Sequence, residues 1–178
     1  MRRDSRLASN EKGETPTPFI HQELSRIPRR AGVYSIGIQL VEPIEVKVRG
    51  KKHILEAGTY VYTGSALGRS SNLYTRIRRH LSGEKKEHWH IDQITRARQA
   101  RTLFVVFSET SDREECTVNR AISDIAGSSI SVAGFGASDC RSGCQAHLLL
   151  LQGEEIAEKI VKAYRTVDLA PKVLELRG

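Results

Sequence analysis

Phenol, guanidinium and imidazole groups lie close together in the sequence between Tyr60 and His80. Tyr60 and Tyr62 are two residues apart in an extended run, so both rings project from one face of a strand. Arg76 and His80 are four residues apart in a helical pattern and therefore lie on one side of that helix. Arginine can bind two oxygens of a phosphate, and a phenol or imidazole can carry a proton. These residue types suit the chemistry of a phosphate diester.

The same segment predicts the elements that hold these groups. Gly64, Ser65 and Gly68 end the strand, and either Ser71 or Asn72 is available as the N-cap of the helix that follows. Apolar residues then recur at helical spacing, at Leu73, Tyr74, Ile77 and Leu81. We therefore expect a strand, a turn and a basic helix.

The rest of the chain predicts an α+β fold with a small antiparallel sheet flanked by helices. Residues 34–40 alternate as a half-buried strand, and residues 44–55 predict a hairpin with its turn at 49–52. The links between these strands are too short for helical crossovers, so the strands must be antiparallel. Further elements are expected as a helix near residues 89–94, a strand at 102–107, a helix at 112–126, a last strand at 147–151 and a C-terminal helix at 154–165.

Two adjacent acids in the 112–126 helix have different expected roles. Ser111 and Glu114 fit the S-x-x-E pattern of a capping box. Glu115 shares the inward, apolar face of the helix with Val118 and Ile122. An inward carboxylate needs a partner, which is either a divalent cation at a cleft or an arginine in a structural salt bridge.

Composition points to a nucleic-acid partner inside a reducing compartment. The 178-residue chain carries a net charge of +7, and its basic excess concentrates between residues 69 and 101. Its three cysteines cannot form a complete disulfide framework. No segment has the pattern of a signal peptide or a membrane span, so we expect a cytoplasmic protein without a membrane partner.

We expect one folded domain with extensions at both ends. Residues 1–18 predict a disordered basic tail, residues 19–152 the domain, and residues 153–178 a C-terminal helical extension.

Cysteine and histidine residues near the end of the domain form a second candidate site. Cys140, Cys144 and His147 have the residue types of a zinc site, and His88 or His90 would supply the fourth ligand. Buried thiols at the start of a strand are the alternative. His90 is also a candidate for orienting His80 or Asp92, and so for a catalytic part.

The sequence resembles the GIY-YIG nuclease family. The first tripeptide corresponds to residues 32–34 (GVY), the second to residues 62–64 (YTG), and the similarity continues through Ser65-Ala66 and the helix at residues 76–80. KKEHWHID, Glu115-Cys116, FGASDC and HLLLL are similar to the Uri-type branch, whose domains also occur beside endonuclease III. The resemblance covers roughly residues 30–151.

This resemblance implies a three-stranded antiparallel sheet and a metal-dependent phosphodiesterase. It implies that Tyr34 and Tyr62 are the active-site tyrosines and that Arg76 stabilises the phosphate. His80 would support the reaction as a proton carrier, and Glu115 would hold one Mg²⁺ or Mn²⁺ ion. The family's late asparagine has no evident counterpart, because Ser138-Asp139 occupies that region. The identity of the general base stays open.

The expected function is hydrolysis of DNA phosphodiester bonds, with RNA not excluded as a substrate. The alternative is a nucleic-acid-binding module that does not cut or needs a partner, with a structural zinc ion. A protein partner or a homodimer would supply targeting. The expected nucleic-acid contacts are Gly64, Ser65, Arg69, Arg78, Arg79, Lys85, Lys86 and Ser138.

Overall fold

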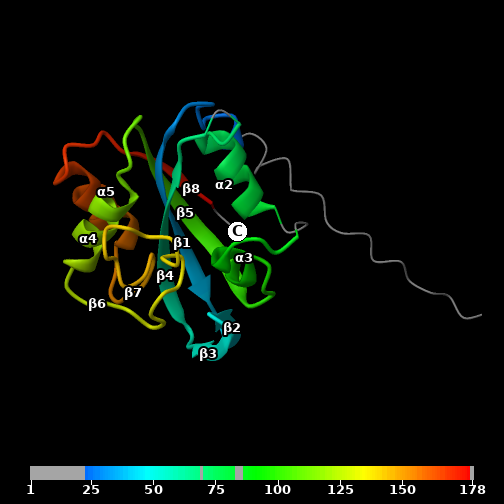
Figure 1. Cartoon of the computed structure of the whole chain (residues 1–178). Coiled ribbons are helices and arrows are strands. Elements are labelled where there is room, and N and C mark those ends of the chain that lie inside the picture. Colours follow the sequence, from blue (N-terminus) through cyan, green and yellow to red (C-terminus); the bar gives the residue numbers. More distant parts are fainter. Residues whose placement is uncertain (1–22, 69, 83–85, 177–178) are drawn as a thin grey trace, which may run out of the picture.

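An antiparallel sheet of six strands forms the centre of the computed structural model, which describes residues 23–68, 70–82 and 86–176 (Figure 1). The strands lie in the order β6-β7-β4-β1-β5-β8. Their bounds are Gly32–Leu40 for β1, Gly58–Ala66 for β4, Ala100–Glu109 for β5, Ser128–Ser129 for β6, Leu148–Leu151 for β7 and Lys172–Glu175 for β8. This arrangement confirms the predicted α+β class.

A separate hairpin connects β1 to β4. Its strands β2 (Ile44–Val48) and β3 (Lys51–Leu55) pair only with each other. Arg49 and Gly50 form the two-residue turn, and both have positive φ angles, of 49° and 76°. Such a turn matches the twist of the two strands. The predicted hairpin is confirmed.

Helices cover both faces of the sheet. Helices α2 (Leu73–Leu81) and α3 (His90–Thr95) lie on the side of the hairpin, while α4 (Glu115–Ser123) and α5 (Ile156–Arg165) lie on the opposite side (Figure 1). Alternate residues of each strand therefore enter two different cores. In β1, Tyr34 belongs to the core beneath α2, and Val33 belongs to the core beneath α4 and α5.

Residues 34–40 lie in a strand, β1, as predicted. The expectation that this strand is only half-buried is wrong, because its second face is also covered. Ser35 is fully buried, and its hydroxyl lies 3.0 Å from both the Thr63 hydroxyl and the Tyr164 hydroxyl. Tyr164 comes from α5. The Ser35 hydroxyl is thus satisfied within the protein rather than by solvent.

The sheet is wider than the three strands that the family resemblance implies. β4, β1 and β5 form its antiparallel centre, and β6, β7 and β8 extend it. β7 is not the last strand: β8 follows α5 and pairs with β5 over Phe104–Phe107. The segment expected as a helical extension after residue 152 therefore contains a helix, α5, and also a strand, β8, that belongs to the same sheet.

Helix α4 begins later than expected. Its first residue is Glu115, and Glu114 occupies the N-cap position without a side-chain hydrogen bond. The predicted capping box between Ser111 and Glu114 is therefore wrong. Asn72 is confirmed as the N-cap of α2, where its side chain accepts a hydrogen bond from the Thr75 N–H at 3.0 Å.

The tail predicted at residues 1–18 lies outside the described residues. Across the ranges that are described, no helix is both long enough and apolar enough to span a membrane.

Candidate active site

One pocket of about 680 Å³ collects the side chains that the sequence singled out for catalysis. It is bounded by the ends of β1 and β4, the helices α2 and α3, the first turn of α4 and the loop between β6 and β7. The predicted residues that line it are Tyr34, Tyr62, Gly64, Ser65, Arg76, His80, His90, Glu115, Ser138, Cys140 and His147. Tyr34 and Glu115, which are 81 positions apart in the chain, thus line the same pocket.

Tyr34 and His80 are joined at the base of this pocket. The Tyr34 hydroxyl lies 2.8 Å from His80 Nε2, and both side chains are almost completely buried. Gly64 is opposite Tyr34 in the paired strands, and a Cβ atom at position 64 would lie 2.7 Å from the Tyr34 hydroxyl and 3.2 Å from the Tyr62 ring. Gly64 was predicted to contact nucleic acid. In the structure its lack of a side chain is what lets the two phenol rings approach each other.

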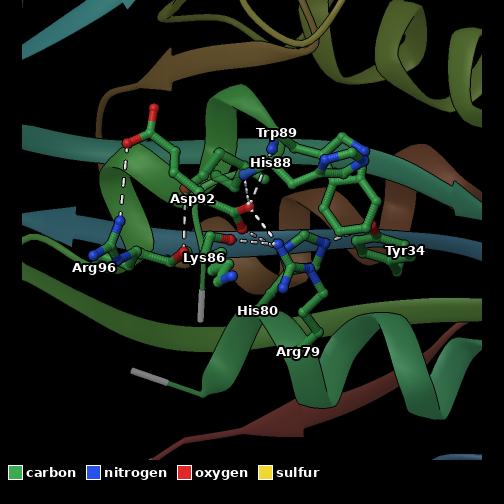
Figure 2. A network of polar contacts seen from close by, with 11 residues as sticks. Tyr34, Arg79, His80, Lys86, His88, Trp89, Asp92 and Arg96 are labelled. Carbon is green, nitrogen blue, oxygen red and sulfur yellow. Dashed lines mark hydrogen bonds and ion pairs between the residues drawn. The ribbon is translucent and has the colours of Figure 1, made fainter. Parts of the chain in front are cut away.

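Asp92 lies on the other side of His80, as Figure 2 shows. Its Oδ1 atom is 3.9 Å from His80 Nδ1. Its Oδ2 atom accepts hydrogen bonds from Arg79 Nη2 at 2.7 Å and from the N–H groups of His88 and Trp89 at 2.9 and 3.1 Å. This fully buried carboxylate faces the imidazole. Tyr34 and Asp92 therefore lie on opposite sides of the His80 ring, the first within hydrogen-bond distance and the second 3.9 Å away.

Burial sets the protonation of both phenols. Burial raises the pKa of Tyr34 well above its usual value, and the neighbouring Tyr62 raises it further, while Arg76 opposes the shift. Burial likewise raises the pKa of Tyr62 to about 12, again opposed by Arg76. Both residues hold their protons at neutral pH. A phenol in this pocket can accept a proton from water only if it passes its own proton on, and His80 is the hydrogen-bonded neighbour of Tyr34 that can take it.

The buried phenols predict a loss of stability in alkaline solution. Burial raises the pKa of Tyr164 as well as those of Tyr34 and Tyr62. Above about pH 10 the unfolded chain loses these protons while the folded chain keeps them. This contribution to the unfolding free energy is therefore complete below about pH 10. It then falls by about 1.4 kcal/mol per pH unit for each tyrosine.

Urea denaturation between about pH 8 and about pH 11.5 measures this slope. Tyr164→Phe removes one buried phenol, on α5, so we expect the alkaline slope to become shallower by about 1.4 kcal/mol per pH unit. An unchanged slope in this variant would contradict the assignment.

Arg76 reaches the pocket from α2. Its guanidinium lies over the Trp89 ring at 4.2 Å from the ring centroid, and its Nε atom donates a hydrogen bond to the Ser71 hydroxyl. These contacts fix a planar, permanently charged group beside both phenols, which is the arrangement that can bind two oxygens of a phosphate. Trp89 packs partly against the core while it lines the pocket.

The other predicted nucleic-acid contacts differ in their surroundings. Ser65 and Ser138 line the pocket, and Arg78 and Lys86 are exposed. Arg79 is instead held in the ion pair with Asp92, and its guanidinium also packs on Trp89 at 4.6 Å. Its first role is therefore structural, which the run of basic residues in α2 could not show. Arg69 and Lys85 lie outside the described residues.

Glu115 projects into the pocket from the first turn of α4. Its Oε2 atom is buried and has no hydrogen-bond partner among the described residues, where Glu115 also forms no ion pair. A buried carboxylate oxygen without a donor is unfavourable unless a cation approaches it. The salt-bridge alternative for this residue therefore lacks a partner in the described chain, and the site fits a divalent ion with oxygen ligands.

His90 takes a different position from the one expected. Its Nδ1 atom accepts a hydrogen bond from the Gly136 N–H at 3.0 Å, and its ring packs against Phe135. Burial, with a smaller effect of Arg49, lowers the pKa of His90, which suits a neutral acceptor. Asp92, rather than His90, is the group that faces His80. His90 lines the pocket and supports the loop that contains Phe135 and Gly136.

A cluster of three thiols and one imidazole forms the wall next to Glu115. The donor atoms of Cys116, Cys140, Cys144 and His147 all lie within 4.8 Å of one another. The predicted set of Cys140, Cys144 and His147 is thus brought together. The expectation that His88 or His90 completes it is wrong, because Cys116 takes the fourth place. Cys116 is 24 residues before Cys140 and belongs to α4, so no local spacing indicates it.

Two arginines that the sequence reasoning missed also line the pocket. Arg113 precedes α4 and Arg141 follows Cys140, and both are exposed. They add two positive charges to a pocket that Arg76, Glu115 and Asp139 also line. Only their position in the folded chain, not their sequence context, distinguishes them from the other arginines.

Comparisons with known proteins give one result. No curated protein and no solved structure matched this chain. One family model matches residues 33–169, which run from β1 to a point just after α5 and include every described residue of the pocket. The chain therefore belongs to the family described as domain of unknown function DUF123.

Proposed function

We propose that this protein is a divalent-metal-dependent endonuclease of the GIY-YIG type that hydrolyses phosphodiester bonds in DNA. The observation that carries the proposal is the convergence of Tyr34, Tyr62, Arg76 and Glu115 in one pocket. These residues come from two strands and two helices that are far apart in sequence. The resemblance to GIY-YIG nucleases assigns catalytic roles to these same four positions.

The chain's own groups can move the proton of an attacking water. Tyr34 takes a proton from the water and passes its phenolic proton to His80 Nε2 across the 2.8 Å hydrogen bond. The resulting imidazolium is stabilised by the Asp92 carboxylate on its other side. This relay lets a phenol with a raised pKa act without accumulating as phenolate.

Arg76 and Glu115 serve the phosphate. Arg76 stabilises the negative charge that grows on the phosphate oxygens as water attacks phosphorus and the bond to the leaving oxygen breaks. Glu115 would hold the divalent cation, Mg²⁺ or Mn²⁺, through its carboxylate, whose Oε2 atom is buried. The cation supplies Lewis-acid stabilisation of a phosphate oxygen and of the leaving alkoxide.

The charge at the mouth of the pocket supports a polyanionic substrate. Arg113 and Arg141 line the pocket together with Arg76, and Arg78 is exposed on the same helix as Arg76. Binding through such contacts weakens as salt rises, because counterions released from the nucleic acid must return. The pocket carries no feature that selects DNA over RNA, so both belong in the test.

Purified protein with labelled single-stranded, double-stranded and branched DNA, and with RNA, tests this proposal. We expect cleavage that requires Mg²⁺ or Mn²⁺ and stops with EDTA. Arg76→Ala should reduce the cleavage rate by about 10²-fold to 10³-fold. Arg165→Ala makes the same change of charge on α5, on the opposite face of the sheet, and should cleave like the wild type.

Two outcomes would count against the proposal. Binding without cleavage on every substrate would favour a binding module that has kept the shape of the site. Cleavage that survives Arg76→Ala at the wild-type rate would remove the pocket from the reaction.

A further inference from the structure

The four donors of the thiol–imidazole cluster have the separations of a tetrahedral metal site. Cys116 Sγ lies 3.5 Å from Cys140 Sγ and 3.7 Å from His147 Nε2. Around a tetrahedral zinc ion, bond lengths of about 2.3 Å to sulfur and about 2.0 Å to nitrogen place ligand atoms roughly 3.5 to 3.8 Å apart. The widest separation in the cluster, 4.8 Å, needs to close by only about 1 Å to reach those values.

The backbone on both sides of the cluster is already fixed. The N–H and C=O groups of His147 are bonded to Phe135 and Thr63 at 2.8 and 2.9 Å. Asn119, on the same helix as Cys116, donates its side-chain amide to the Ala146 carbonyl at 2.8 Å. Helix α4 and the start of β7 are therefore held at a set distance. Preorganisation of this kind lowers the cost of closing a metal site.

Unligated thiols or a single disulfide would explain less of this arrangement. All three cysteines are free in the structure. A disulfide between Cys116 and Cys140 would use two of the four donors and leave Cys144 and the buried His147 without a common function. Three thiols and one imidazole converging from three segments are the ligand set of structural zinc sites.

We propose that Cys116, Cys140, Cys144 and His147 bind one zinc ion that fastens the loop between β6 and β7 to the first turn of α4. Binding displaces the thiol protons, so the three cysteines coordinate as thiolates. All four coordination positions are filled by protein, which makes the site structural rather than catalytic.

This zinc ion would also shape the neighbouring pocket. Cys116 directly follows Glu115, so a ligand bond to Cys116 fixes the turn from which Glu115 projects. The fastened loop contains Gly136, where a Cβ atom would lie 2.8 Å from the Tyr62 ring, and Ser138, which lines the pocket. This positioning role rests on the proposed nuclease function, whereas the zinc site itself does not.

Metal analysis of the protein purified without chelator or added metal tests the site directly. We expect one zinc ion per chain. Replacing zinc by Co²⁺ should give the visible absorption of tetrahedral cobalt bound to thiolates. Cys144→Ser should weaken zinc binding at least 100-fold and lower the melting temperature, because even an indirect support of a metal ligand is worth 10-fold to about 100-fold. Cys144→His supplies another zinc ligand, so it should recover most of the zinc affinity and most of the melting temperature.

These readouts separate the two proposals. Protein without zinc, with iron in its place, or with a Cys116–Cys140 disulfide would overturn the zinc site whatever the nuclease assay gives. A zinc-loaded protein that cuts no substrate would overturn the nuclease and leave the site standing. Cleavage by Cys144→Ser at the wild-type rate, below its melting temperature, would overturn the positioning of Glu115.

Discussion

Replacing Glu115 by glutamine is expected to lower the rate of DNA cleavage by about 10³-fold at saturating Mg²⁺. Glutamine keeps the size of the side chain but loses the charge that holds the cation. The Glu115 Oε2 atom is buried and accepts no hydrogen bond from the described residues, so this oxygen is available to a metal ion. Single-turnover cleavage measured over a range of Mg²⁺ concentrations reports this loss.

Glu114→Gln is the matched control for this variant. Glu114 precedes Glu115, makes no side-chain cap and does not line the pocket. It should cleave at the wild-type rate. Glu115→Gln should unfold at the same urea concentration as the wild type, because the Glu115 carboxylate forms no hydrogen bond or ion pair with the described residues that glutamine would lose. Wild-type cleavage by Glu115→Gln at every Mg²⁺ concentration would show that this carboxylate holds no catalytic ion.

Local sequence patterns were sufficient for the parts of the site that lie on single elements. The helical spacing of Arg76 and His80 and the inward direction of Glu115 follow from the period of an α-helix, and the structure places all three in the pocket. The β2–β3 hairpin follows from a turn too short for a crossover. These features depend on the backbone geometry of neighbouring residues, which a single sequence contains. The same argument does not explain the centre of the sheet, because β1 pairs with β4 and β5, which no short connection joins to it.

Contacts between distant elements were not available from such patterns. The burial of Ser35 depends on Tyr164, which is 129 residues later, and the fourth member of the thiol–imidazole cluster is Cys116 on α4. β8 is a short strand after the C-terminal helix, and its pairing with β5 has no local signal. A periodic pattern shows which face of an element is apolar, but it does not show what covers that face.

Asp92 illustrates the same limit within the candidate active site. The sequence placed it beside two histidines and left open which residue orients His80. Because α3 starts at His90, Asp92 sits in the first turn, where its carboxylate accepts the N–H groups of His88 and Trp89. The remaining oxygen then faces His80. The orientation of the imidazole is thus a consequence of how one helix begins.

Asp92→Asn is accordingly expected to reduce both stability and activity. Its carboxylate is completely buried and pairs with Arg79 at 2.7 Å. The asparagine amide removes the charge that offsets the partly buried guanidinium and halves the number of acceptor oxygens. Breaking a buried pair in this way costs about 3 kcal/mol of unfolding free energy. Cleavage should also fall by about 10-fold to 100-fold, because His80 loses the group that stabilises its protonated form.

Urea denaturation and single-turnover kinetics on the same preparation separate these two effects. Asp112→Asn, an exposed acid in the loop before α4, is the control and should change neither quantity. If Asp92 acts on His80, the loss of rate must persist at low urea and low temperature, where the variant is folded. A variant that is destabilised but cleaves normally when folded would confine Asp92 to packing and show that His80 needs no anionic neighbour to receive the proton from Tyr34.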